Sequence, residues 1–290
     1  MKPDLIAYDL INKGKNTEAL EYLDLAINNK IGDQLKLYQQ RGYVYVCLGD
    51  TEKALADFEW ALAIEPRSNY ALMCKSIINL GAERFEQALA DFNLIPETNL
   101  LGERYWELGK DIFIKTKNYE RALYFAERLC NNDKENYNYV YNKGWCLSKL
   151  LRHRESILVY QGLIDRTHFQ HLIFNNLGFV YIMVGEYEVA GSYLIKGLKL
   201  EPAYAYLNSN ISIYYFFKKQ MDKAMHHIDV SIENGPSNSF AYFLRSKYLL
   251  SLDRNDEALK EMEIAEKLGL NTDFPIERSV LEKTIFSSTH

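Results

Sequence analysis

Small and apolar residues return along this chain at a fixed interval, and the interval predicts its architecture. One small residue recurs every 34 residues. The series is Ala54, Ala88, Ala122, Ser156, Ala190, Ala224 and Ala258, and Ala19 stands 35 residues before its first member. A constant period of this length is typical of repeat proteins, in which each period is one supersecondary unit that stacks on its neighbours.

Glycines, prolines and aromatic residues fall on the same lattice. The sets are Gly42, Gly144 and Gly178; Pro66, Pro202 and Pro236; and Tyr45, Phe113, Tyr181 and Tyr215. There are only 6 prolines in 290 residues, so the long periodic segments are predicted to be helices. A proline at the end of a period stops a helix, because it donates no backbone hydrogen bond and clashes with the preceding turn.

The period and its residue types resemble the tetratricopeptide repeat, a helix–turn–helix unit. Residues 35–68 carry the resemblance most completely, through Tyr38, Gly42, Tyr45, Ala54, Phe58, Ala61 and Pro66. Residues 171–204 match nearly as well. The resemblance implies that the two helices of a repeat pack antiparallel and that neighbouring repeats stack, because no repeat buries its apolar face alone.

We therefore expect an all-α fold, a right-handed α-solenoid (superhelix) of about eight tetratricopeptide-type repeats. Residues 1–272 are predicted to form the repeat domain. Residues 273–290 are predicted to form a C-terminal capping segment over the last repeat, with a helix that begins near Pro275 and turns Ile276, Val280 and Leu281 inward. Repeats 3 and 4 depart from the pattern, and a local bend rather than a domain boundary is expected there.

The resemblance implies that the first helix of each repeat lines a concave inner face. One inner position holds asparagine in three successive repeats, at Asn142, Asn176 and Asn210. Asparagine is a poor helix-interior residue, so a column of three needs an explanation. A primary amide can pair with both the N–H and the C=O of an extended peptide. The alternative is that each asparagine bonds a neighbouring helix and tunes the packing of repeats.

Aromatic residues surround the predicted asparagine column. The inner positions around it are Tyr141, Trp145, Asn175, Phe179, Tyr206, Phe240 and Phe243. A groove of this composition, nearly neutral, favours an apolar or tyrosine-rich peptide. The alternative is that some of these rings belong to the core between repeats.

Composition narrows the class of partner and the compartment. The net charge of −5 and the pI of about 5.8 give no basic footprint for a nucleic acid. The first residues lack the apolar region of a secretory signal, and no apolar run approaches the ~20 residues of a membrane span. The 4 cysteines show no pairing pattern, which is typical of free thiols in a reducing compartment. We therefore expect a cytoplasmic protein without membrane insertion.

The sequence contains no pattern that indicates catalysis. There is no glycine-rich phosphate loop, no GxSxG and no HExxH. The pairs His168 with His171 and His226 with His227 lack a third converging ligand, so no metal site is expected. Catalytic residues and cofactors are accordingly predicted to be absent.

The predicted function is that of a non-catalytic adaptor or scaffold that holds an extended peptide in its groove. The carboxylate clamp by which some members of the family bind chaperone tails is not expected, because it needs a lysine at a position where no repeat here has a basic residue. One alternative is a structural subunit that docks folded partners, or a second copy of itself, on convex or end surfaces. Another is a regulator whose superhelix tightens around a signalling peptide.

Overall fold

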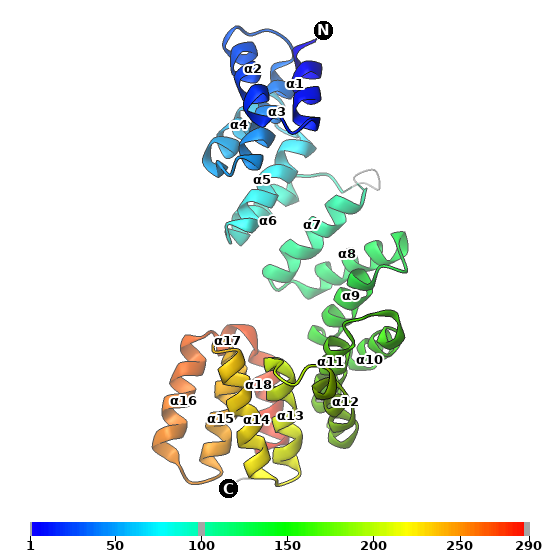
Figure 1. Cartoon of the computed structure of the whole chain (residues 1–290), viewed down its shortest axis with the longest axis vertical. Helices are drawn as coiled ribbons and strands as arrows, with labels where there is room; N and C mark the ends of the chain where they lie inside the picture. The colour runs from blue at the N-terminus through cyan, green and yellow to red at the C-terminus, as the bar shows by residue number, and fades with distance from the viewer. Residues whose placement is uncertain (1, 98–101, 287–290) are drawn as a thin grey trace. The chain divides into compact units, whose positions relative to one another are not determined.

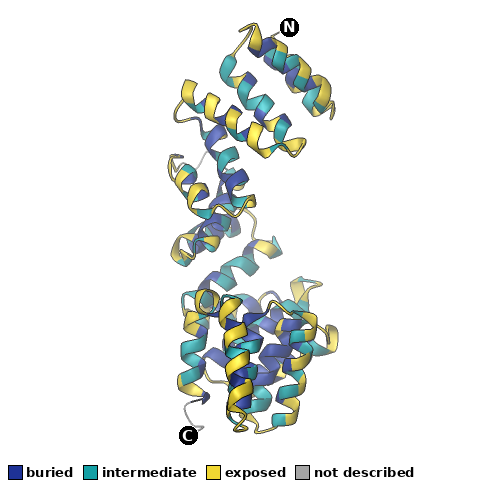
Figure 2. Ribbon diagram, turned by 90° about the vertical axis from the view of Figure 1, so that its left-hand side faces the viewer, coloured by how far each residue is buried: buried dark blue, intermediate teal, exposed yellow. Residues whose placement is uncertain are grey.

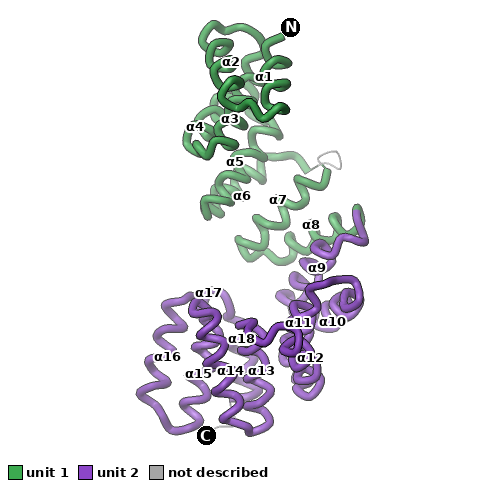
Figure 3. The backbone as a smooth tube through the Cα atoms, viewed as in Figure 1, with its two compact units in different colours: residues 1–132 green, residues 133–290 purple. Residues whose placement is uncertain are grey.

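The computed structural model describes residues 2–97 and 102–286, and within those ranges the chain is helical without strands. It forms two compact units, residues 1–132 and 133–290 (Figure 3). The division falls between helices α8 (Tyr119–Asn132) and α9 (Tyr137–Lys149), at a boundary between two of the predicted repeats.

The first unit consists of four antiparallel helical hairpins (Figure 1). Their helices, in pairs, are α1 (Pro3–Asn12) and α2 (Asn16–Asn28), α3 (Gln34–Cys47) and α4 (Thr51–Ile64), α5 (Asn69–Gly81) and α6 (Phe85–Asn93), and α7 (Gly102–Lys115) and α8 (Tyr119–Asn132). Helix α6 ends short of Pro96, as the rigid φ of proline and its missing N–H require.

The second unit consists of four more hairpins and a C-terminal segment. The helices are α9 (Tyr137–Lys149) and α10 (His153–Gln161), α11 (Gln170–Met183) and α12 (Tyr187–Leu200), α13 (Ala205–Phe217) and α14 (Met221–Asn234), α15 (Ser239–Leu250) and α16 (Asn255–Lys267), α17 (Leu270–Asp273), and α18 (Pro275–Thr284). A short 3₁₀ turn, Ile164–Arg166, joins α10 to α11.

The residues of the 34-residue lattice lie where two helices meet. The small residue of the series is fully buried in seven hairpins and 2% exposed at Ala258. In each unit the buried residues gather where helices face one another (Figure 2). Ser156 stands where the other repeats have alanine. Its buried hydroxyl has a partner, because its Oγ donates to the carbonyl of Gly144 at 2.8 Å. A Cβ on Gly178 would lie 2.4 Å from Leu194, so only glycine permits this approach of α11 and α12. The residues that recur every 34 positions are therefore those at which paired helices contact each other.

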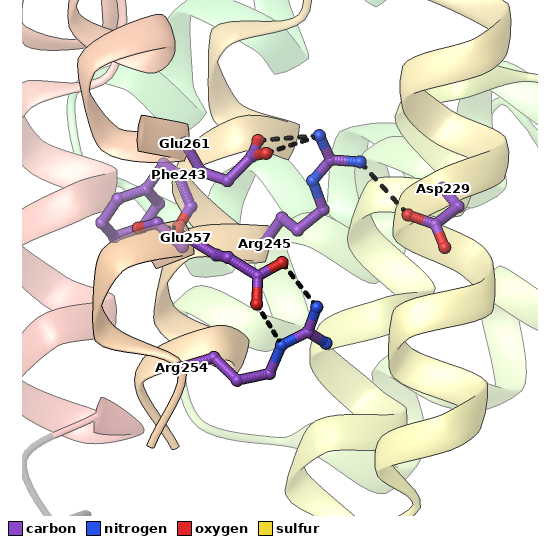
Figure 4. A network of polar contacts seen from close by, with 7 residues as sticks. Asp229, Phe243, Arg245, Arg254, Glu257 and Glu261 are labelled. Atoms are coloured by element: carbon purple, nitrogen blue, oxygen red, sulfur yellow. Dashed lines mark hydrogen bonds and ion pairs between the residues drawn. The ribbon is translucent and has the colours of Figure 1, made fainter. Parts of the chain in front are cut away.

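Ion pairs tie some hairpins to the hairpin before them. Arg41 on α3 donates to Asp57 on α4 through two bonds of 2.8 and 2.7 Å and to Asp24 on α2 at 2.7 Å. In the second unit Arg245 on α15 binds Glu261 on α16 and Asp229 on α14 in the same way (Figure 4). Since each cation holds one acid of its own hairpin and one of the preceding hairpin, it fixes the register of the stack.

A lysine occupies the equivalent position of α5. Lys75 Nζ lies 3.5 Å from Asp91 on α6 and 3.8 Å from Glu59 on α4. The three cations are separated by multiples of the repeat period. The ion triad is therefore a recurrent part of the repeat, although its lysine form is looser than the arginine form.

Each of the eight turns inside a hairpin contains one residue with a positive φ. These residues are Gly14, Gly49, Glu83, Lys117, Leu151, Gly185, Lys219 and Asp253. At Leu151 and Arg152 the backbone N–H groups bond back to the carbonyls of Ser148 and Leu147, which closes the end of α9. The left-handed region suits glycine, so the turns that lack glycine are strained.

The C-terminal segment lies against the first helices of several hairpins. Helix α18 contacts α11, and its Glu277 and Glu282 form ion pairs with Lys149 on α9 and Lys247 on α15. It buries Leu281 and leaves Ile276 41% exposed, whereas the sequence predicts that both face inward. The reason is that the buried stripe passes through Glu277, one residue beyond Ile276. The last part of the predicted capping segment, residues 287–290, lies outside the described residues.

A reciprocal pair of substitutions tests the strain in the turns. Leu151 is 51% exposed and has a φ of 59°, so Leu151→Gly should raise the free energy of unfolding by about 0.5–1 kcal/mol. Gly185 has a φ of 81° with no atom within 4 Å of an added Cβ, so Gly185→Leu should lower it by about 1–2 kcal/mol. Urea unfolding followed by circular dichroism measures both. If both substitutions changed the free energy of unfolding in the same direction, strain at positive φ would not explain their effects.

Candidate protein-binding surface

The predicted site residues lie on the first helices of the second unit, α9, α11, α13 and α15. They differ in exposure. Tyr206 is 48% exposed. Five residues are half-buried, namely Tyr141, Asn142, Trp145, Asn176 and Phe179. Four are buried, namely Asn175, Asn210, Phe240 and Phe243. The structure therefore separates the predicted set into an accessible part and a part enclosed by the chain itself.

Three of the amides form a ladder of hydrogen bonds across hairpins. Asn210 Nδ2 on α13 donates to Asn175 Oδ1 on α11 at 2.9 Å, and Asn175 Nδ2 donates to Asn176 Oδ1 at 3.1 Å. Asn176 Nδ2 in turn donates to the hydroxyl of Tyr160 on α10 at 3.0 Å. The ladder thus joins three consecutive hairpins. These bonds are of the kind expected if the asparagines tune the packing of repeats, which is the alternative to peptide binding.

Asn142 differs from the other members of the predicted column. Its Nδ2 donates to the carbonyl of Asn138 at 2.8 Å, which is a bond within its own helix α9. Like Asn176 it is half-buried, whereas Asn210 is buried. Because a local bond on an accessible face is exchanged more readily than a buried one, Asn142 is the member of the column best placed to meet a peptide backbone.

The enclosed aromatic residues lie beneath the C-terminal segment. Phe240 stacks on Phe274 at a centroid distance of 5.1 Å and meets Phe179 edge-on at 6.2 Å. Phe243 is fully buried and contacts Phe286 edge-on at 6.1 Å. Phe240 and Phe243, which the sequence predicts to face a peptide, are therefore covered by Phe274 and Phe286 of the C-terminal segment.

An aromatic row runs along one end of the first helices, which we call the aromatic edge. It consists of Tyr141, Tyr137, Phe169, His171, Tyr204 and Tyr206. Successive centroids lie 5.7, 6.4, 6.5, 5.5 and 5.7 Å apart. Phe169 is 55% exposed. The row connects the beginnings of α9, α11 and α13, so it extends over three hairpins.

Sequence reasoning found only two members of the aromatic edge, Tyr141 and Tyr206. The others stand at the first residue of a repeat or just before it, outside the inner positions that the family resemblance supplies. A signal was present, because Tyr137 and His171 are one period apart.

A cavity of about 430 Å³ adjoins the aromatic edge between two loops. It is lined by His171, Glu201, Ala203, Tyr204, Ala205, Tyr206, Asn234, Gly235, Ser237 and Asn238. Burial raises the pKa of Tyr204 to about 12. This hydroxyl therefore stays protonated at neutral pH and offers a hydrogen-bond donor beside an apolar ring.

His227 supports the aromatic edge through Asn208. Asn208 donates to the carbonyls of Pro202 and Tyr204 at 2.7 and 3.0 Å, which orients the loop before α13. Its Oδ1 lies 2.8 Å from Nδ1 of His227, and the His227 ring stacks on Tyr215. Burial lowers the pKa of His227 to about 4, so the imidazole is neutral at neutral pH and donates from Nδ1.

The described ranges gather no three His, Cys, Asp or Glu side chains that could hold a metal ion. None of the helices within those ranges is both long and apolar enough to cross a membrane.

Comparison with known proteins places the repeat in a family. Residues 35–68 match the tetratricopeptide repeat. A segment of 63 residues is 35% identical to anaphase-promoting complex subunit 7 of Dictyostelium discoideum, covering 22% of this chain and 11% of that protein. The chain therefore spans about a tenth of the length of this relative.

Solved structures share the fold at low identity. A monomeric mutant of IFIT1 solved with Gppp-AAAA aligns over 97% of this chain and 73% of its own, with 14% identity and a TM-score of 0.54. A tetratricopeptide repeat protein from Parabacteroides merdae aligns over 97% and 96%, with 17% identity and a TM-score of 0.45. The expected all-α fold of stacked helical hairpins is confirmed.

Two asparagine substitutions separate the structural from the accessible amide. Asn210 is 5% exposed, and Asn210→Ala leaves Asn175 Oδ1 without its donor, so we expect a loss of about 1–3 kcal/mol in the free energy of unfolding. Asn142→Ala should change it by less than about 0.5 kcal/mol, since alanine is the better helix former. Urea unfolding of the two variants measures the difference. Equal losses would show that the ladder contributes no more than a local bond.

The state of His227 predicts a dependence of stability on pH. Its pKa is about 4 in the folded chain and ~6.5 when unfolded, so between these values the unfolded chain binds the extra proton. The contribution of neutral His227 is complete above pH ~6.5 and is lost as the pH falls toward 4. The melting temperature of the wild type should therefore fall more between pH 7 and 4.5 than that of His227→Gln. His168→Gln, a change at an exposed histidine that is not among the groups acting on His227, should behave like the wild type.

Proposed function

We propose that this chain, which belongs to the tetratricopeptide repeat proteins, is a non-catalytic scaffold that binds a peptide segment of a protein partner along the aromatic edge of its second unit. The aromatic edge is the observation that carries the proposal. Six rings form a continuous row across three hairpins, and Phe169 and Tyr206 leave about half of their surface in water. Exposed rings that continue a half-buried aromatic row form an apolar patch of the kind that often marks an interaction site.

The character of the edge favours an apolar or tyrosine-rich segment. Tyrosines supply large contact area with a polar tip, and they dominate the energetics of many interfaces. In this proposal Tyr141, Trp145 and Tyr206 contact side chains of the segment, and Asn142 contacts its backbone. Asn175, Asn176 and Asn210 act mainly by holding the hairpins in register, as their mutual hydrogen bonds support.

We also place the protein in the cytoplasm. Cys47 is exposed and forms no disulfide. An exposed free thiol suits a reducing compartment.

A second function has a specific observation in its favour. The relative from Dictyostelium is by its name a subunit of a complex. The chain would then dock folded subunits, or a second copy of itself, through outer or end surfaces. A molecular mass that rises with protein concentration in the absence of ligand would favour this function over the groove.

Peptide-display selection on the wild type and on Tyr206→Ala tests the proposed function. The wild type should enrich a linear motif rich in apolar or aromatic residues, and the variant should bind the enriched peptide about 10-fold or more weakly, since a few aromatic anchors carry most of such binding energy. Leu158→Ala is the matched control, because Leu158 is 69% exposed on the second helix α10 of the same unit. An enriched peptide that binds all three proteins equally would place the site elsewhere.

A further inference from the structure

We propose that the inner face of the second unit is a helix-binding groove, that α18 fills it in the free protein, and that the partner is an amphipathic helix with the inward-facing pattern of α18. This goes beyond the proposed function, because the residues that receive α18 are not those of the aromatic edge.

The buried side of the C-terminal segment is a single helical stripe. Glu277, Leu281 and Ile285 follow one another at intervals of four residues, and Phe274 stands three residues before Glu277. These intervals are the spacing of one helix face. Glu277, Leu281, Ile285 and the adjacent Phe286 are all less than 10% exposed, while Lys283 faces water. The segment thus has the form of a peptide helix laid into a groove.

The groove meets this stripe with matching chemistry. At one end, Phe274 stacks on Phe240 of α15. At the other end, Phe286 packs on Phe216 of α13 at 5.3 Å. Between them Lys149 of α9 binds Glu277, with side chains 16% and 8% exposed.

A second ion pair flanks the stripe. Lys247 of α15 lies 3.0 Å from Glu282, and its ammonium group also lies 5.5 Å from the Phe243 ring centre. The two lysines come from different first helices, α9 and α15. The groove therefore favours a helix that has two acidic residues five positions apart and an aromatic residue at each end.

The groove is made of the same inner positions that the repeat lattice predicts for ligand binding. Phe240 and Phe243 are members of that predicted set, and Lys149 and Lys247 stand at inner positions of their repeats. Release of α18 would expose Phe240, Phe243 and the surface beneath Leu281 to water. The free protein needs an occupant there, and a foreign helix of the same pattern restores the same burial.

The connection from α16 to α18 includes Gly269 and the four-residue helix α17, which contacts α15 and α16 and buries Leu270. The exchange proposed for α18 leaves α17 in place. The buried pair of Lys149 and Glu277 gives specificity of register more than strength, because taking both charges out of water offsets most of their attraction. A competing helix with an acid at the equivalent place recovers the pair in full.

A labelled synthetic peptide of residues 273–286 serves as the model partner helix. It should bind wild-type protein weakly, because α18 already fills the groove. Glu277→Lys places a lysine opposite Lys149, so it should release α18 and let the unmodified peptide bind about 10-fold or more tightly than to the wild type. Fluorescence anisotropy measures the affinity. Hydrogen exchange of residues 275–284 measures the release.

Two further proteins make the result specific to the groove. Glu233→Lys is the same change at an exposed position of α14 and should bind the peptide as weakly as the wild type. Lys149→Glu should release α18 but bind only a peptide that carries Glu277→Lys, since the charges are then exchanged. If Glu277→Lys does not fold, Glu277→Gln removes the charge without changing the shape, and the same gain in affinity is expected in smaller measure.

Three results would overturn the proposal. One is equal peptide affinity for the wild type and for a variant with released α18. Another is a released α18 whose groove binds no peptide. The third is a concentration-dependent dimer that keeps α18 protected, which would make a second copy the occupant. Failure of the proposed function is seen separately, because the dependence on Tyr206 is measured on the aromatic edge and not on the residues that hold α18.

Discussion

Each hairpin of this chain buries its apolar face against a neighbour, because two helices cannot enclose a core by themselves. The recurrent features serve that contact. Fully buried Ala54 and its equivalents let the helices approach, and a positive-φ residue reverses the chain between them. Where the contact alone does not fix the register, a cation such as Arg245 reaches acids on two hairpins (Figure 4). Within each unit the stack is thus a series of nearest-neighbour interfaces, and some of them carry an ion triad.

The same constraint decides which inner residues remain for binding. Asn176 and Asn210 face inward, yet their amides are bonded to Tyr160 and Asn175, so their capacity serves the interface between hairpins. Tyr206 has no comparable lock: its neighbour in the row is a ring, and half of its surface meets water. On a face built by stacking, exposure and uncommitted hydrogen-bonding capacity identify a binding residue better than residue type does. The aromatic edge satisfies that criterion, and the buried amides do not.

Much of the fold could be predicted from the sequence, because a 34-residue period repeats the same local choices of helix, turn and contact. Gly178 is an example, since its lattice position alone indicates a close approach. The bonding of Asn210 to Asn175 could not be predicted, since the lattice places both on the inner face without giving their rotamers. The location of α18 was also out of reach, because an amphipathic pattern predicts a helix and not the surface that receives it. One signal was present: Glu277 interrupts an apolar stripe, and a buried acid needs a cation, which Lys149 supplies.

A permanent cap has no need of a buried carboxylate. An apolar residue at the place of Glu277 would pack against the same helices without desolvating two charges, and such replacements are often neutral or stabilising. Because of the ion pair, docking of α18 depends on the charge of Glu277, which Lys149 binds. The cost of burying both charges limits the free energy of docking. A partner helix then competes with α18, and its apparent affinity falls by the fraction of chains in which the groove is open. The docking equilibrium of α18, set by the Lys149–Glu277 pair and the two phenylalanine contacts at its ends, therefore determines how strongly a partner must bind.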